Sequence, residues 1–134
     1  MADVNRGDRP MSRPLSPHLT IYAPQITWIS SILTRITGNA LIVAALMLVW
    51  WFVALASGPE SFAVADGFVR SWFGYLVLTL SAWALWYHTL AGLRHLYWDT
   101  GRGLEIETAE RLGWACVIGS VVLTVLTVLL FWIV

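Results

Sequence analysis

The sequence predicts an all-α integral membrane protein with three transmembrane helices. Of its 134 residues, 58% are hydrophobic and only 12% are charged, a balance far from that of a soluble domain. Three apolar stretches, residues 29–56, 68–96 and 112–134, are each long enough to cross a lipid bilayer, which takes about 20 residues. The formal net charge is zero, so the composition indicates no nucleic acid as partner.

The segments around these spans are short and polar. Residues 1–28 contain four of the five prolines and are predicted to form an irregular cytoplasmic arm. Residues 58–67 and 98–111 are expected to be polar links, so that the chain forms one membrane-anchor domain, 1–134. The first span resembles a signal peptide at Ala54-Leu55-Ala56, but its apolar part is about twice as long as a signal core and is expected to stay in the chain.

The arginines predict the orientation in the membrane, because cationic residues near the spans stay on the cytoplasmic side. One arginine, Arg70, lies at the first link. The others belong to the N-terminal side or to the second link: Arg6, Arg9, Arg13 and Arg35, and Arg94, Arg102 and Arg111. The N-terminus and the second link are therefore predicted to be cytoplasmic, and the C-terminus to be outside.

The first span carries a polar stripe in its N-terminal half. Ser31, Arg35 and Asn39 recur at every fourth residue and share one helix face. An arginine at a helix centre costs about 2.5 to 3.5 kcal/mol on membrane-insertion scales. Arg35 could extend to the lipid headgroups, but its polar neighbours favour a stripe turned inward, toward an anionic or hydrogen-bonding ligand.

The second span carries two histidines, His88 and His95, on one face with Ser81. Small residues beside His88, at positions 84, 91 and 92, are expected to leave room for a flat, bulky group. His88 lies about 9 Å before Arg94, close to the depth of Arg35. An imidazole and a guanidinium at one depth suit a haem, which needs an axial nitrogen and a partner for its propionates.

The positions of the two histidines are also compatible with roles other than haem binding. Packing against a neighbouring helix explains His88 as well as haem ligation does, and His95 also suits an interfacial pair with Asp99. The two histidines stand about 10.5 Å apart along one helix face, so they cannot ligate one iron from opposite sides. A six-coordinate haem at His88 therefore requires a second axial ligand from another chain.

Three motifs give the chain a family resemblance. RPLSPHLTIY at 13–22, SILTRITG at 31–38 and HTLAGLRHLYWD at 88–99 resemble the cytochrome b large membrane-anchor subunits of succinate dehydrogenase, the succinate:quinone oxidoreductase of respiratory complex II. The resemblance implies a haem b shared with a smaller anchor subunit and a ubiquinone-reduction site. It also implies a flavoprotein and an iron–sulfur subunit as partners. It places the chain in a bacterial cytoplasmic membrane rather than a mitochondrial inner membrane.

The resemblance also implies roles for individual residues. His88 matches the haem axial ligand, and Ser31 and Arg35 match residues that bind quinone, with Arg35 also near a haem propionate. Thr34 stands where many members have a histidine that contacts a propionate. The remaining implied roles are pocket support for Thr34 and His95, and docking to the iron–sulfur subunit for Arg94 and Asp99.

The chain has no dinucleotide-binding motif and no CxxC cluster, so the oxidation of succinate is not expected to be its own chemistry. Two other functions remain open from the residues. One is a proton or small-molecule transporter that uses Arg35 and His88. The other is a structural anchor without haem, in which His88 only packs.

Overall fold

The chain folds into four helices in the computed structural model, which describes residues 24–133. They are α1 (Ile26–Ser57), α2 (Pro59–Val69), α3 (Trp72–Asp99) and α4 (Ile106–Ile133). Three of them, α1, α3 and α4, are long and apolar enough to cross a membrane. The predicted all-α fold with three candidate spans is therefore confirmed. The RPLSPHLTIY motif and the last residue, Val134, lie outside the described residues.

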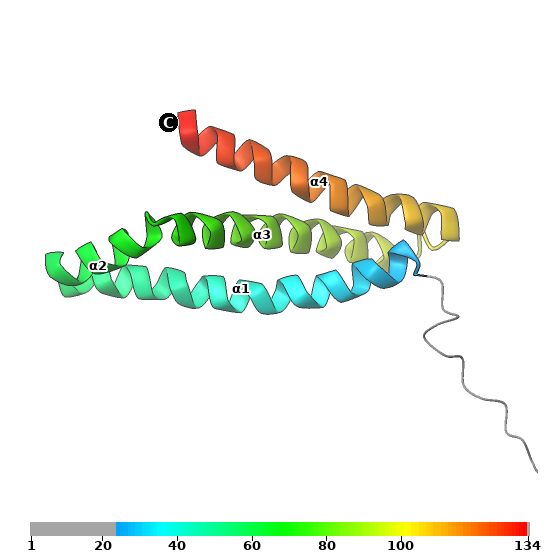
Figure 1. Cartoon of the computed structure of the whole chain (residues 1–134). Coiled ribbons are helices and arrows are strands. Elements are labelled where there is room, and N and C mark those ends of the chain that lie inside the picture. Colours follow the sequence, from blue (N-terminus) through cyan, green and yellow to red (C-terminus); the bar gives the residue numbers. More distant parts are fainter. Residues whose placement is uncertain (1–23, 134) are drawn as a thin grey trace, which may run out of the picture.

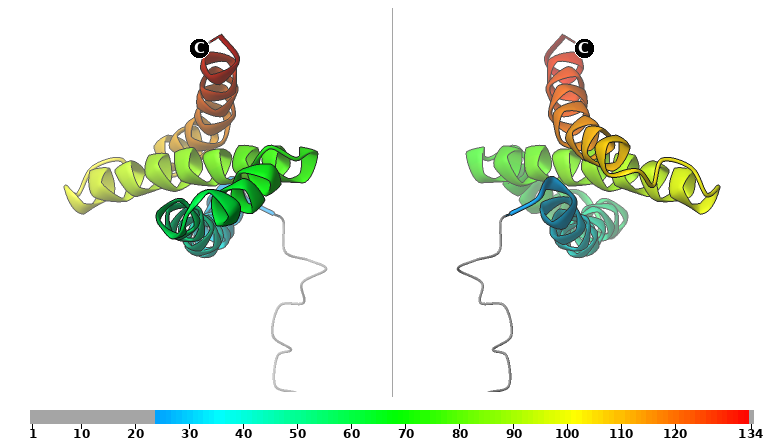
Figure 2. Two further views of the ribbon diagram at one scale, coloured as in Figure 1. Left: turned by 90° about the vertical axis from the view of Figure 1, so that its left-hand side faces the viewer. Right: turned by 90° about the vertical axis from the view of Figure 1, so that its right-hand side faces the viewer.

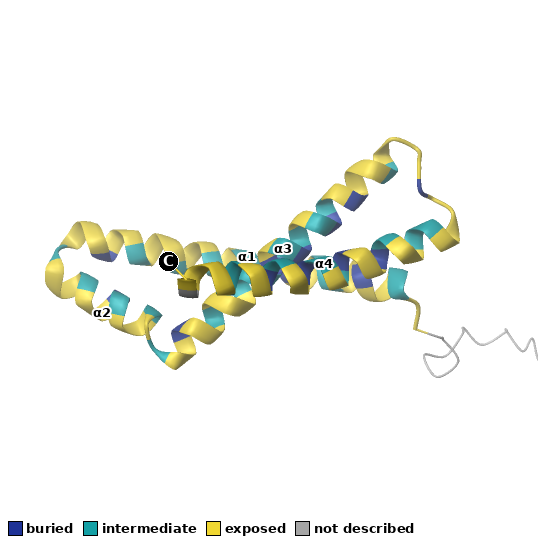
Figure 3. Cartoon of the chain, turned by 90° about the horizontal axis from the view of Figure 1, so that it is seen from above, coloured by how far each residue is buried: buried dark blue, intermediate teal, exposed yellow. Residues whose placement is uncertain are grey.

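The central helix of the arrangement is α3. It lies between α1 and α4 and makes most of the contacts between helices (Figures 1 and 2). Toward the C-terminus α4 diverges from α3, and Phe131 and Ile133 at its end are 85% and 80% exposed. Exposed residues cover much of the helix surfaces, and the buried and half-buried ones gather where α1, α3 and α4 meet (Figure 3). Such apolar exposure suits a chain surrounded by lipid and by other membrane subunits.

Small residues allow the helices to approach one another closely. Ala84 and Ala91 of α3 are 3% and 0% exposed, and Ala91 packs in a small core with Tyr87 and Cys116. The prediction that these alanines leave room for a flat ligand is therefore wrong, because neighbouring helices occupy that space. Gly92 alone fits the prediction, since a Cβ atom on it would meet nothing within 4 Å.

The first link, predicted only as a short polar segment, forms a helix, α2. Pro59 occupies its first turn together with Glu60, and both residues favour a helix N-terminus. Aromatic rings pack α2 against the end of α1. The ring centroids of Phe62 and Trp51 are 5.3 Å apart, and those of Phe68 and Trp50 are 5.7 Å apart.

The helices also begin at other residues than hydropathy predicted. α1 begins at residue 26 instead of 29, and α4 begins at residue 106 instead of 112. α3 begins at residue 72 instead of 68, because the chain turns at Ser71, whose hydroxyl caps α3 by accepting a hydrogen bond from the Gly74 amide. Hydropathy identifies the part of a helix that lipid surrounds, and polar turns extend the helix beyond it.

Candidate functional site

His88 is held against α1 by its Nδ1 atom. Nδ1 lies 3.1 Å from the main-chain carbonyl oxygen of Thr34 and 3.4 Å from the hydroxyl oxygen of Thr37. A carbonyl oxygen can only accept a hydrogen bond, so Nδ1 carries the ring proton and Nε2 carries the lone pair. Within residues 24–133, Nε2 makes no hydrogen bond and is not enclosed. This is the arrangement of a metal-binding histidine, whose other ring nitrogen donates to a carbonyl.

Gly38 allows the His88 ring to lie close to α1. A Cβ atom on Gly38 would stand 3.1 Å from Cε1 of His88, tighter than nearly all real contacts. Gly38 and Ser31 are seven residues apart, which is nearly two complete turns, so they lie on the same side of α1. The imidazole therefore lies toward the side of α1 that carries Ser31.

The polar stripe of α1 is exposed, and so are two polar residues near the end of α3; we call these five residues the outer flank. Its members are all exposed in the structure: Ser31, Arg35 and Asn39 of α1, and His95 and Asp99 of α3. Within the described bundle the stripe does not turn inward onto another helix, and its contact with a ligand stays a prediction. The side of α1 that packs against α3 is the neighbouring one, where Ser30 and Thr37 are buried. The outer flank is left for a ligand, another subunit or lipid.

Arg35 lies at the depth of His88, as the spacing predicted. His88 contacts Thr34 and Gly38, and these two residues bracket Arg35 along α1. The main-chain carbonyl of Arg35 accepts a hydrogen bond of 3.1 Å from the side-chain Nδ2 of Asn39. In the part of the chain that the structure describes, no carboxylate forms an ion pair with Arg35. Its guanidinium can therefore bind an anionic or polar ligand beside His88.

The hydroxyl groups of α1 differ in their availability. Those of Ser30, Thr34 and Thr37 donate hydrogen bonds of 2.8 to 2.9 Å to carbonyls one turn earlier in the helix. The Ser31 hydroxyl forms no hydrogen bond with any described residue. Ser31 can therefore offer both a donor and an acceptor to a ligand, whereas Thr34 supports His88 through its carbonyl.

Arg94 does not lie on the surface that was predicted for docking. It is 4% exposed, and its Nη1 donates a 3.0 Å hydrogen bond to the hydroxyl of Ser30. Its guanidinium also stacks 4.7 Å from the ring centroid of Trp98. The fully buried Tyr87 donates to the Ser30 carbonyl at 3.1 Å. Sequence reasoning missed Ser30 and Tyr87, because the pattern of a single helix does not tell which side meets its neighbour.

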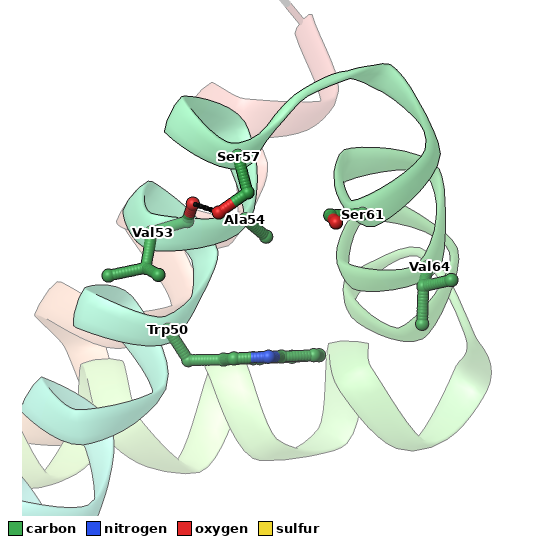
Figure 4. A pocket seen from close by; sticks show the side chains of 6 residues that line it. All are labelled: Trp50, Val53, Ala54, Ser57, Ser61 and Val64. Atoms are coloured by element: carbon green, nitrogen blue, oxygen red, sulfur yellow. Dashed lines mark hydrogen bonds between the residues drawn. The ribbon is translucent and has the colours of Figure 1, made fainter.

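A cavity elsewhere in the chain is not part of this site. It has a volume of about 340 Å³ and lies between the end of α1 and α2 (Figure 4). Its nearest member on α1, Trp50, stands about 18 Å along the axis from Gly38. None of its lining residues is titratable: Trp50, Val53, Ala54, Ser57, Ser61 and Val64. The cavity therefore offers no acid, base or metal ligand.

The described residues can supply one axial ligand to a metal. Among residues 24–133, no group of three or more His, Cys, Asp or Glu side chains comes together. His88 and His95 are about 10.5 Å apart along one helix, so only one of them can reach a given metal. His88 can therefore supply one axial nitrogen to a haem, and a second axial ligand would have to come from outside the described residues.

Comparison with known proteins identifies the family. Residues 9–127 match the family model described as "Succinate dehydrogenase/Fumarate reductase transmembrane subunit". The chain belongs to this family. The predicted function as a cytochrome b-type membrane-anchor subunit of succinate dehydrogenase is thereby confirmed.

Individual relatives match over most of their length. The chain is 55% identical to the succinate dehydrogenase cytochrome b556 subunit of Paracoccus denitrificans over 133 residues, which cover 99% of each chain. It is 43% identical to the subunit of that name from Rickettsia conorii, over 85% of this chain and 89% of the relative. It is 40% identical to the succinate dehydrogenase cytochrome b560 subunit of Reclinomonas americana, over 78% of this chain and 76% of the relative.

Proposed function

We propose that this chain binds one haem b through Nε2 of His88, and that a smaller anchor subunit provides the second axial ligand. The observation that carries the proposal is the Thr34 carbonyl on Nδ1, which leaves Nε2 free. Gly38 keeps the ring against α1, and Arg35 at the same depth can bind a haem propionate. When bound, haem b supplies a centre that accepts and releases one electron.

The same flank supports a second part of the proposal, a ubiquinone site at Ser31 and Arg35. The free hydroxyl of Ser31 can donate a hydrogen bond to a quinone carbonyl oxygen. The guanidinium of Arg35 stabilises negative charge that develops on that oxygen as electrons arrive. Both side chains are exposed and lie one turn apart, so one ring can reach both.

The proposed partners are the flavoprotein, the iron–sulfur subunit and the smaller anchor subunit of one complex. The arginine distribution supports a cytoplasmic N-terminus and second link, and the proposed location is a bacterial cytoplasmic membrane. His95 and Asp99 are exposed on the last turns of α3, beside that second link. They suit a role in docking or pocket support on the side where the soluble subunits bind.

The test replaces His88 by Leu in the complex assembled with its partner subunits. We expect the haem b absorbance in the reduced-minus-oxidised spectrum to be lost or strongly changed, because one axial nitrogen is missing. Oxidation of succinate with a dye that takes electrons from the soluble subunits shows whether the complex has assembled. An assembled His88→Leu complex with the parent spectrum would exclude His88 as the ligand.

A further inference from the structure

Arg94 is a buried positive charge that forms no ion pair with any carboxylate of residues 24–133. Among residues 24–133, Arg94 is the one charged residue in the buried class, at 4% exposure. The ion pairs of this part of the chain join Arg70 to Asp66 and Arg111 to Glu107, and neither includes Arg94. A buried charge is normally paired, because removing it from water is costly.

The groups around Arg94 solvate its charge without cancelling it. Its Nη1 donates to the neutral hydroxyl of Ser30, and its guanidinium stacks on the neutral ring of Trp98. Its Nε is buried without a hydrogen-bond partner in the described structure. Helices of this chain alone cover 96% of the residue, so little of its surface is left for a carboxylate from another subunit.

This charge lies close to the axial histidine. Arg94 contacts Ser30, and His88 contacts Thr34, four residues further along α1. Four residues of helix span about 6 Å, so the guanidinium is roughly one helical turn from the carbonyl that holds the imidazole. In the low dielectric of a membrane interior, charges at this separation interact strongly, and mobile ions screen buried charges little.

We propose that Arg94 raises the reduction potential of the haem b bound at His88, without contacting the haem. The inference rests on the proposed haem site. Reduction adds one electron, and a fixed positive charge nearby stabilises the reduced form over the oxidised form. Arg35 differs from Arg94 in this respect, because it is exposed and a propionate can neutralise it.

The experiment is a redox titration of the haem absorbance in the complete complex with Arg94→Gln. The glutamine keeps a hydrogen-bond donor for Ser30 and removes the charge, so the midpoint potential is expected to fall. Arg102→Gln is the matched control, because it makes the same change of net charge at an exposed loop position and should keep the parent potential. An Arg94→Gln complex that contains haem at the parent potential overturns the proposal.

Arg94→Lys keeps the proposal testable where the glutamine variant does not assemble. Lysine retains the charge and loses the planar guanidinium, so the haem should keep a potential near that of the parent. A clear fall of the haem midpoint potential in Arg94→Lys, where the charge is kept, would assign the effect to packing and overturn the proposal. Failure of the haem site itself is recognised separately, because the parent spectrum would then survive His88→Leu.

Discussion

Neighbouring residues of this chain lie in opposite environments on the two sides of α1 and α3. Ser30 is fully buried and accepts hydrogen bonds from α3, whereas Ser31 is exposed with a free hydroxyl. Arg94 is buried, whereas His95 is exposed. One residue along a helix rotates the side chain by about 100°, which moves it from the packed interior to the outer flank. Adjacent residues of similar chemistry can therefore hold the helices together and bind ligands, respectively.

Among the substitutions that test this comparison, the largest effect is expected at Gly38, where the His88 ring of α3 lies against α1. In Gly38→Val, the new side chain meets the His88 ring and is expected to push it away from the Thr34 carbonyl. Overpacking of this kind costs about 1 to 3 kcal/mol, equivalent to about a 5- to 150-fold loss of haem affinity. The loss of haem is measured as the haem content per assembled complex, from the reduced-minus-oxidised spectrum.

Gly67→Val is the matched control for Gly38→Val. A Cβ atom on Gly67 would meet nothing within 4 Å, so haem content should not change. Parent haem content in the Gly38→Val complex would show that the ring does not need its close approach to α1.

An intermediate effect is expected from the two adjacent serines, which separate the two environments directly. Ser31→Ala removes the free hydroxyl and should lower quinone-dependent turnover about 2- to 150-fold, for a hydrogen bond of about 0.5 to 3 kcal/mol. Dye-linked succinate oxidation should persist. Ser30→Ala leaves Nη1 of Arg94 without its acceptor and should cost about 1 to 3 kcal/mol of stability, with quinone turnover unchanged.

The measurements for the serine pair are thermal unfolding of the assembled complex and turnover with a soluble quinone. Loss of quinone reduction in Ser30→Ala, with quinone reduction kept in Ser31→Ala, would contradict the roles given to the two serines. Equal turnover in both variants and in the parent would place the quinone away from Ser31.

The smallest effect is expected at His95. His95→Leu removes an exposed ring that makes an edge contact, 5.2 Å between centroids, with Trp98. The six-coordinate haem spectrum should remain, and stability should change by no more than about 0.5 kcal/mol, as for most surface substitutions. A high-spin haem spectrum in this variant would mean that His95, and not His88, is close to the iron.

The three spans could be predicted from the sequence because each is a long apolar stretch, and lipid exposure makes that signal strong. α2 was missed because eleven residues with Glu60 and Asp66 look like a polar link. Pro59 at its start and aromatic residues at positions 62 and 68 were the available signal, and their partners Trp50 and Trp51 become evident only in three dimensions.

The positions of the candidate residues along each helix could be predicted, but the direction in which they face could not. The spacing of Ser31 and Arg35 and the position of His88 are properties of single helices, so the sequence could indicate them. The burial of Arg94 depends on how α3 is rotated against α1. The roles of Ser30 and the Thr34 carbonyl depend on the register between these two helices. Any residue type has a main-chain carbonyl, so the hydrogen bond from Nδ1 of His88 to the Thr34 carbonyl could not be predicted from the sequence.

The bond between His88 and the Thr34 carbonyl has a consequence for the movement of protons. A histidine that conducts protons receives one at one ring nitrogen, releases one from the other and then resets. The Thr34 carbonyl has no proton to give, and Gly38 lies against the ring, so Nδ1 keeps its proton and cannot complete this cycle. Protons for a quinone bound at Ser31 and Arg35 would therefore come from water or from other residues of the outer flank. Electrons and protons would then reach the same ring along separate paths.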